Sequence, residues 1–205
     1  IVNMGLISNG TTLLDAGATS SGVFSGAMVL LATTTLTSNA AVIDFTNPAM
    51  SSTYKEYVFK IINIHPENDD VTFGFQVETG TGTQYTTATT STMFRSTHGE
   101  DGSSGGLAYL TGGDLADNTG LKPLASSVGN DADQCVSGEL RIYEPSSTVF
   151  VKHFTGTFNS IAHSNRTNLQ FPSGYFDITT ALTRVRFKFS AGDIGSGTIK
   201  MYGVL

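Results

Sequence analysis

The side chains with the clearest capacity for chemistry are acidic and amide residues that gather in three turn-like segments. They are Glu67, Asn68, Asp69 and Asp70 in the first segment, Glu100 and Asp101 in the second, and Asn130, Asp131 and Asp133 in the third. Calcium binds several oxygen ligands from loops of this kind. None of the three segments has the spacing of an EF-hand loop, and Asp and Asn are common in turns because they hydrogen-bond their own backbone. We therefore predict no metal site and no cofactor.

Nucleophilic and acid–base residues are few, and no pattern joins them. Cys135 is the single cysteine, and nothing in the sequence identifies a histidine partner that would make it a catalytic thiol. A small, buried residue at the start of a strand is the alternative reading of Cys135. The histidines form no metal-binding pattern with one another or with the cysteine. They are His65, His98, His153 and His163. No spacing singles out a pair of catalytic carboxylates. The sequence therefore predicts a protein that is not an enzyme and has no catalytic residues.

The composition narrows the class of protein further. The chain has 205 residues, a formal net charge of −6 and only 14% charged residues. Ser, Thr, Asn and Gly must therefore cover much of the surface, because the usual charged fraction is about a quarter. An acidic chain with few cations lacks the electrostatic signature of a nucleic-acid-binding protein. No apolar stretch approaches the roughly 20 residues of a membrane span.

Alternation of apolar and polar residues predicts β-strands to position these side chains. The clearest strand is "VTFGFQVE", in which Val71, Phe73, Phe75 and Val77 share one face. The segment "TYKEYVFKIINI" is apolar on both faces, which is typical of a central, covered strand. There Tyr57, Phe59 and Ile61 are expected on one face, and Val58, Ile62 and Ile64 on the other. Eight to ten such strands predict an all-β, antiparallel, jelly-roll-like sandwich.

Two segments interrupt this pattern, and they set the expected domain organisation. Residues 1–26 are rich in Gly, Ser and Thr and predict an extended N-terminal arm that serves in assembly. Residues 27–205 then form a single sandwich domain, with a loop-rich excursion at 98–133. A loop with one short strand is expected at 163–180.

The end of the chain, "LTRVRFKFSAGDIGSGTIKMYGVL", predicts a closing hairpin. Val185, Phe187 and Phe189 should face inward, with Ile199 and Met201 on the paired strand. The glycines around Ser196 are expected to make the tight turn between the two strands.

Four stretches of the sequence carry a resemblance to a known group of proteins. They are "GLISNGTTLLDAG", "STYKEYVFKIINIHPENDDVTFGFQV", "GNDADQCVSGELRIYEPSSTVFVKHF" and "VRFKFSAGDIGSGTIKMYGV". These stretches resemble virion structural proteins of tailed bacteriophages of the marine type, which form tail fibres, appendages or head decorations with a jelly-roll fold. The resemblance leaves residues 80–128 unplaced, and its motifs are structural.

The resemblance implies a non-enzymatic component of a virion, assembled in the host cytoplasm, which docks on the particle and presents its sandwich outward. Its expected partners are other virion proteins of the capsid or tail and copies of itself, with a homotrimer favoured by the resemblance. The alternative is a glycan-binding module that recognises the host surface through the 98–133 excursion, where Tyr109 is the only aromatic residue. A capsule- or wall-degrading enzyme is a third possibility, but it requires a carboxylate pair that the sequence does not single out.

Overall fold

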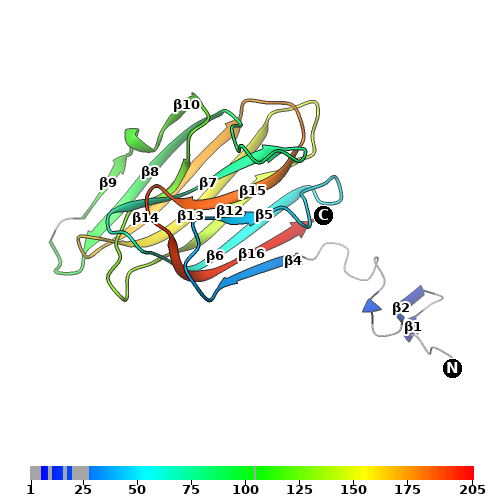
Figure 1. Ribbon diagram of the computed structural model, residues 1–205, viewed down its shortest axis with the longest axis horizontal. Helices are drawn as coiled ribbons and strands as arrows, with labels where there is room; N and C mark the ends of the chain where they lie inside the picture. Colours follow the sequence, from blue (N-terminus) through cyan, green and yellow to red (C-terminus); the bar gives the residue numbers. More distant parts are fainter. Residues whose placement is uncertain (1–5, 9–10, 16–17, 20–27, 104) are drawn as a thin grey trace.

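The protein is an all-β, antiparallel sandwich (Figure 1). The structure, a computed structural model, describes residues 6–8, 11–15, 18–19, 28–103 and 105–205. Within these residues the one helical element is the short 3₁₀ helix η1, Thr111–Gly113. The prediction of an all-β, jelly-roll-like fold is therefore confirmed.

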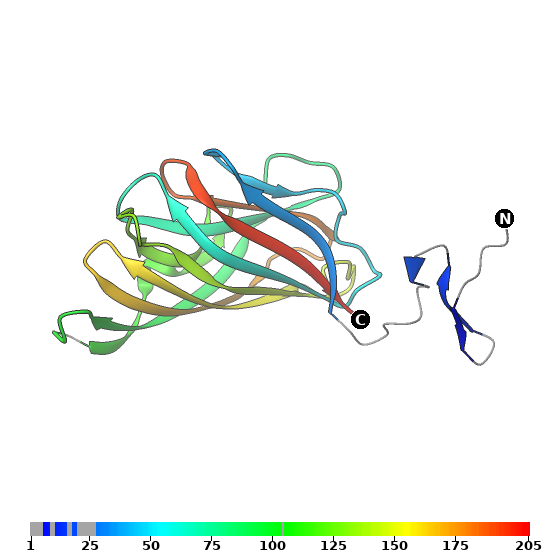
Figure 2. The ribbon, with the colours of Figure 1, turned by 90° about the horizontal axis from the view of Figure 1, so that it is seen from below.

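The sandwich consists of two layers of antiparallel strands that face each other (Figure 2). The wider layer has the order β4 (Val29–Leu36), β16 (Ile194–Val204), β6 (Glu56–Pro66), β12 (Val136–Tyr143), β13 (Lys152–Ala162), β14 (Arg166–Phe176) and β8 (Thr89–Gly99). Two short strands, β9 (Gly105–Tyr109) and β10 (Leu115–Asn118), pair with successive parts of β8. The narrower layer has the order β11 (Lys122–Val128), β7 (Val71–Thr79), β15 (Leu182–Phe189) and β5 (Ile43–Phe45).

The two layers are joined along one side, where Val128 of β11 pairs with Ala162 of β13. An isolated bridge between Ala40 and Ile194 links the segment before β5 to the start of β16. The sheet is therefore almost closed on itself, and the apolar faces of both layers meet in one core.

A cluster of phenylalanine rings fills the centre of this core. Phe73 and Phe75 of β7 and Phe187 and Phe189 of β15 are all 0% exposed. The ring centres of Phe73 and Phe189 lie 5.3 Å apart, and those of Phe75 and Phe187 lie 6.3 Å apart. The predicted inward faces of Val71–Val77 and of Val185–Phe189 are confirmed.

The predicted terminal hairpin is wrong, although its buried faces are correct. β15 pairs with β7 and β5, whereas β16 pairs with β4 and β6, so consecutive strands lie in different layers. The chain crosses between the layers at residues 190–193, where Gly192 has a φ of +69°. Ile199 and Met201 are buried, as predicted, but they face β15 across the core instead of pairing with it.

The predicted face of Ile64 is wrong, because β6 contains a bulge. Asn63 has a φ of +49°, and the pairing of β6 with both neighbours shifts register near this residue. A bulge inserts one extra residue, so the alternation reverses beyond it. Ile64 is therefore 0% exposed and joins Tyr57, Phe59 and Ile61 in the core, while Ile62 is 41% exposed.

Two segments, predicted as a loop-rich excursion and as a loop with one short strand, contain more strand than expected. Residues 98–133 include η1 and three strands, of which β11 lies inside the narrower layer with Leu124, Ala125 and Val128 buried. Residues 166–176 form β14, which pairs with β8 along its whole length. Pro172 has no N–H to donate, and the pairing of β14 with β13 is interrupted around it. The proline is thus accommodated by a local gap on one side of the strand.

The predicted arm at residues 1–26 is described only in part. Its described residues form a separate antiparallel sheet of three short strands, β1 (Leu6–Ser8), β2 (Thr11–Asp15) and β3 (Ala18–Thr19). None of these strands pairs with a strand of the sandwich. The remaining residues of the segment lie outside the described ones.

Candidate functional site

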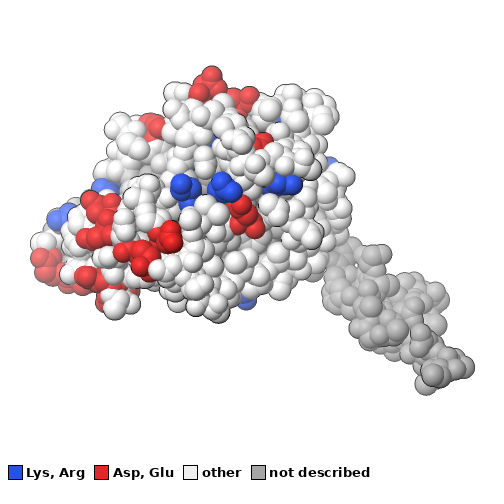
Figure 3. Space-filling model, viewed as in Figure 1, with Lys and Arg blue, Asp and Glu red and all other residues white. Residues whose placement is uncertain are grey.

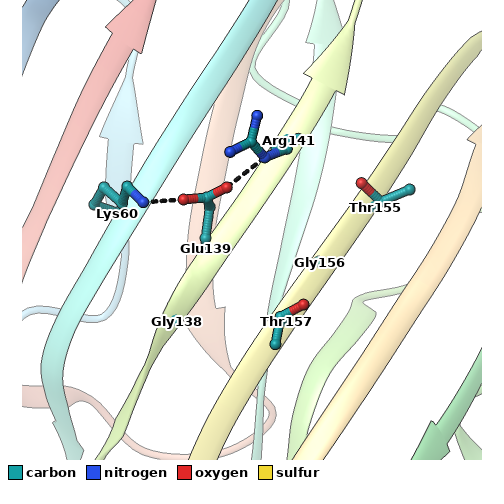
Figure 4. Close-up of a pocket in the computed structure, with 7 residues that line it drawn as sticks. All are labelled: Lys60, Gly138, Glu139, Arg141, Thr155, Gly156 and Thr157. Carbon is teal, nitrogen blue, oxygen red and sulfur yellow. Dashed lines mark hydrogen bonds and ion pairs between the residues drawn. The ribbon is translucent and has the colours of Figure 1, made fainter. Parts of the chain in front are cut away.

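A shallow polar groove crosses the outer face of the wider layer (Figure 4). Its volume is about 490 Å³, and its walls come from β6, β12 and β13. Strand pairing places Glu139 between Lys60 and Thr157, and Arg141 opposite Thr155. These side chains share one face because each lies an even number of residues from its neighbour on the same strand.

Beneath this groove, two neighbouring positions of the sheet are glycines and carry no side chain on the core side. A Cβ on Gly138 would lie 2.6 Å from the ring of Phe158, and a Cβ on Gly156 would lie 2.7 Å from the same ring. The Phe158 ring therefore occupies, on the core side, the space that side chains at both positions would need. The floor of the groove is backbone, and the core is packed directly beneath it.

The charged groups of the groove form one connected network. Glu139 accepts hydrogen bonds from the ammonium of Lys60 and from Nε of Arg141. Arg141 also reaches Glu56, with 2.6 Å between Nη1 and Oε1. Partial burial opposes ionisation of Glu139, but the Lys60 hydrogen bond and the Arg141 charge outweigh it and hold the pKa of Glu139 below its ordinary value.

This network suits binding better than proton transfer. A general acid needs a pKa raised toward neutrality, and the environment of Glu139 lowers it. Each charge in the groove already has a partner of opposite sign. Thr155 and Thr157 are exposed, and the Thr155 hydroxyl shares a hydrogen bond of 2.9 Å with the Tyr143 hydroxyl. The groove can therefore donate and accept hydrogen bonds with a neutral polar ligand.

A second feature of the same outer face is a group of exposed apolar side chains, which we call the apolar patch. It comprises Phe94 of β8, Leu107 and Tyr109 of β9 and Leu169 of β14, together with the half-buried Phe171 of β14. Phe171 pairs with Phe94, which pairs with Tyr109, and Leu169 and Leu107 flank Ser96 in the same way. The patch therefore runs without interruption across three neighbouring strands.

The rings of Phe94 and Phe171 stack on each other, with centres 4.7 Å apart and planes 17° apart. Each ring thus covers one face of the other, which reduces the flat aromatic surface that a sugar ring could stack on. Tyr109 is 61% exposed, and its hydroxyl donates to Asp114 over 2.5 Å.

β9 forms the free edge beside this patch. All five of its residues are exposed, and the strand "GGLAY" carries no charged side chain and no proline. Natural proteins usually protect an edge strand with charges, proline or bulges, because unpaired backbone groups recruit another strand. β9 has none of these protections.

Cys135 and the four histidines, which the sequence singled out for chemistry, each have different surroundings in the structure. Cys135 is half-buried, and burial raises the pKa of its thiol, which disfavours the reactive thiolate. The histidines make separate contacts: His65 with the Gln134 carbonyl, His153 with the Tyr175 ring, and His163 with Asp70. His98 lies near the end of β8.

Two of the three acidic turns do approach each other. The backbone N–H of Asn130 donates to Asp69 over 3.3 Å, and its side-chain amide donates to the Glu67 carbonyl over 3.0 Å. The contact is thus made by an amide rather than by facing carboxylates. Within the described residues, no three His, Cys, Asp or Glu side chains gather as a metal ion would require.

Of the site residues, sequence analysis found only Tyr109. Phe94 and Phe171 were missed because their strand pairing depends on β14, which was predicted as a loop. The groove was missed because its residues come from distant parts of the chain. Lys60 and Glu139, for example, are 79 residues apart.

Comparison with known proteins gives no assignment: no protein family, curated protein or solved structure matches this chain. In the described part of the chain, no helix has the length and apolar character to cross a membrane.

Proposed function

We propose that the chain is a non-enzymatic structural subunit of a bacteriophage particle, an exterior decoration, tail-fibre or appendage protein assembled in the host cytoplasm. The resemblance of residues 52–77 and 185–204 to phage virion proteins supports this proposal. The observation that carries it in the structure is the apolar patch beside an unprotected edge strand. A contiguous exposed apolar surface of this kind is typical of a protein that functions in an assembly.

The partner that this surface fits best is a second copy of the chain. β9 is uncharged, so two copies do not repel each other along this edge despite a net charge of −6 each. An antiparallel approach of two β9 strands places Leu107 against Leu107 and adds backbone hydrogen bonds between the strands. A trimer, favoured by the resemblance, would instead bring the patch against a different face of its neighbour.

An aspartate in place of Leu107 should disrupt this association. Leu107 is 74% exposed, so Leu107→Asp leaves the core intact but places a charge at the centre of the interface. Sedimentation velocity should show an oligomer for the unchanged protein and an association at least tenfold weaker for Leu107→Asp. Val149→Asp is the matched control, because Val149 is 71% exposed and lies outside the patch. A monomer at all concentrations, or equal weakening by both variants, would contradict this interface.

The virion assignment is tested separately with particles that lack the protein. Such particles should bind the full chain added in excess and should not bind a chain of residues 27–205, because we propose that residues 1–26 tether the sandwich to the particle. The truncated chain should keep its β-sheet circular dichroism and its melting transition. Failure of the full chain to bind argues against the virion role, and equal binding of both chains argues against the tether.

The groove of Figure 4 favours a second candidate function, recognition of a host-surface glycan. Its paired charges and exposed hydroxyls match the hydrogen-bonding groups of a neutral sugar. This function is compatible with the first, since a particle component can also bind its host.

A further inference from the structure

A second polar hollow lies at one end of the sandwich, where β8 and β14 meet the end of β11. Its volume is about 190 Å³. It is lined by Arg95, Thr97, Ser127, Ala162, His163, Ser164, Arg166 and Asn168. Backbone pairing fixes its walls: Arg166 is opposite Gly99, and Asn168 is opposite Thr97. The backbone N–H of His163 donates to the Ser127 carbonyl over 3.2 Å, which closes the third side.

The lining is cationic, although the chain carries a net charge of −6. Two arginines and a histidine line the hollow, and no carboxylate does. Acidic side chains gather at one end of the molecule on the face shown in Figure 3 (red, left), so a cationic lining is not a general property of this surface. Three carboxylates lie outside the lining: Asp70 contacts His163 at 3.1 Å, Asp101 lies close enough to Arg166 to be affected by its charge, and Glu100 lines the neighbouring hollow that Arg166 shares.

Arg95 is the residue of this hollow that most strongly indicates a ligand. Its Nε atom is buried and has no hydrogen-bond partner among the described residues. A buried guanidinium N–H without an acceptor is costly, because the group has lost water and gained nothing in return. Arg95 also lines an adjoining hollow of about 250 Å³, together with Ser126 and Ser127. Arg95 thus lines two adjoining hollows, while its Nε donor has no acceptor among the described residues.

We propose that this hollow binds a small oxyanion, namely a sulfate, phosphate or carboxylate group. Arginine is suited to such groups because its N–H donors match their oxygens in pairs. The hydroxyls of Thr97, Ser127 and Ser164 and the amide of Asn168 supply further neutral donors around the same space. At about 190 Å³ the hollow is smaller than the roughly 300 Å³ at which pockets begin to hold whole small molecules, so it fits a single group.

The anionic group can come from a free ion or from an acidic saccharide. A neighbouring hollow of about 310 Å³ shares Ser164 and Arg166 and is also lined by Glu100, Asp101 and Ser103, which offer hydrogen bonds to a polyol. A sugar ring in this outer hollow would place its sulfate or carboxylate beside Arg95 and Arg166. The site is separate from the groove and from the apolar patch, so it does not rest on the function proposed above.

The experiment is an NMR titration of the full chain at constant ionic strength. The ligands are sodium sulfate, sodium phosphate, galactose 6-sulfate, glucuronic acid and, as a neutral control, galactose. We expect saturable binding of the anions and none of galactose in this hollow. Arg95→Met should weaken anion binding at least tenfold. Lys188→Met, which removes the same charge from the outer side of β15, should leave it unchanged.

The outcomes separate the two sources of the group. Tighter binding of the acidic sugars than of sulfate and phosphate supports a saccharide ligand, whereas equal binding supports a free oxyanion and rejects the sugar. Absence of saturable binding by every anion overturns the site, as does equal loss in Arg95→Met and Lys188→Met. Arg166→Met provides an independent variant if Arg95→Met lowers the melting temperature, because Arg166 is exposed at the start of β14.

Discussion

Replacement of Phe187 with alanine should lower the free energy of unfolding by about 3–5 kcal/mol, the usual cost of removing a buried phenylalanine ring. The Phe187 ring is 0% exposed and lies at the centre of the core. Its centre is 5.3 Å from that of Phe59 and 6.0 Å from that of Phe73. Phe45 and Phe75 are at 6.1 and 6.3 Å. Four rings from three strands of both layers would therefore lose a neighbour, and the cavity could not collapse without moving both layers.

Chemical denaturation of the two proteins measures this loss. Phe150→Ala is the matched control, because Phe150 is 69% exposed and its truncation should change the free energy of unfolding by less than about 0.5 kcal/mol. Phe75→Ala should resemble Phe187→Ala, since Phe75 contacts Phe154 and Phe176 as well as Phe187. Unchanged stability in both buried variants would show that the inward faces of β7 and β15 are misassigned.

These faces could be predicted from the sequence because the period of a strand is local. Phe73 and Phe75, and likewise Phe187 and Phe189, are two residues apart, so one pleated strand places each pair on one side. The same reasoning predicted that Ile199 and Met201 are buried. The partner of each strand is a non-local property, however. The alternation of β15 and β16 is the same whether they pair with each other or face each other across the core.

Local backbone features account for the remaining errors in the fold. The bulge at Asn63 reverses the alternation of β6, and a positive φ at a single asparagine leaves no signal in the apolar pattern. Pro172 made β14 look like a loop, yet the gap in pairing with β13 lets the strand continue. In residues 98–133 the many turn residues obscured β11, in which two serines separate the buried pair Leu124 and Ala125 from the buried Val128.

Even less of the candidate sites than of the fold could be predicted from the sequence. Arg95 and Arg166 are far apart in the chain, and only the pairing of β8 with β14 brings their strands together. Ser127 reaches them from the other layer, which no local pattern encodes. Tyr109 could be found because it is an isolated aromatic residue in a polar segment.

Lys122 is a buried cation that the sequence analysis did not single out. It begins β11 and is 0% exposed. Its ammonium donates to the carbonyl oxygens of Thr87 at 2.9 Å and Gly120 at 3.0 Å. Burial lowers the pKa of Lys122 from 10.5 to about 8, and the charge of Asp177 opposes this change only in part.

The protein should therefore become more stable relative to a Lys122→Met variant as the pH rises from about 8 to 10.5. In this range the unfolded chain keeps a proton on Lys122 that the folded chain has lost, so stability increases with pH. Below about pH 8 both states carry the proton, and above 10.5 neither does, so the difference between the two proteins is flat on either side. The lowering from 10.5 to about 8 corresponds to a total gain of about 3 kcal/mol. A neutral amine still has two N–H groups, which suffice for the two carbonyls.

The measurement is a series of urea unfolding curves at pH 7.5, 8.5, 9.5 and 10.5 for the unchanged protein, Lys122→Met and Lys188→Met. Other groups that ionise in this range are present in all three proteins, so their contributions cancel in the comparison. Lys188→Met should follow the unchanged protein in parallel, because Lys188 lies partly exposed on the outer side of β15. A parallel curve for Lys122→Met as well would mean that the Lys122 ammonium keeps its ordinary pKa, and hence that water reaches it beside Thr87 and Gly120.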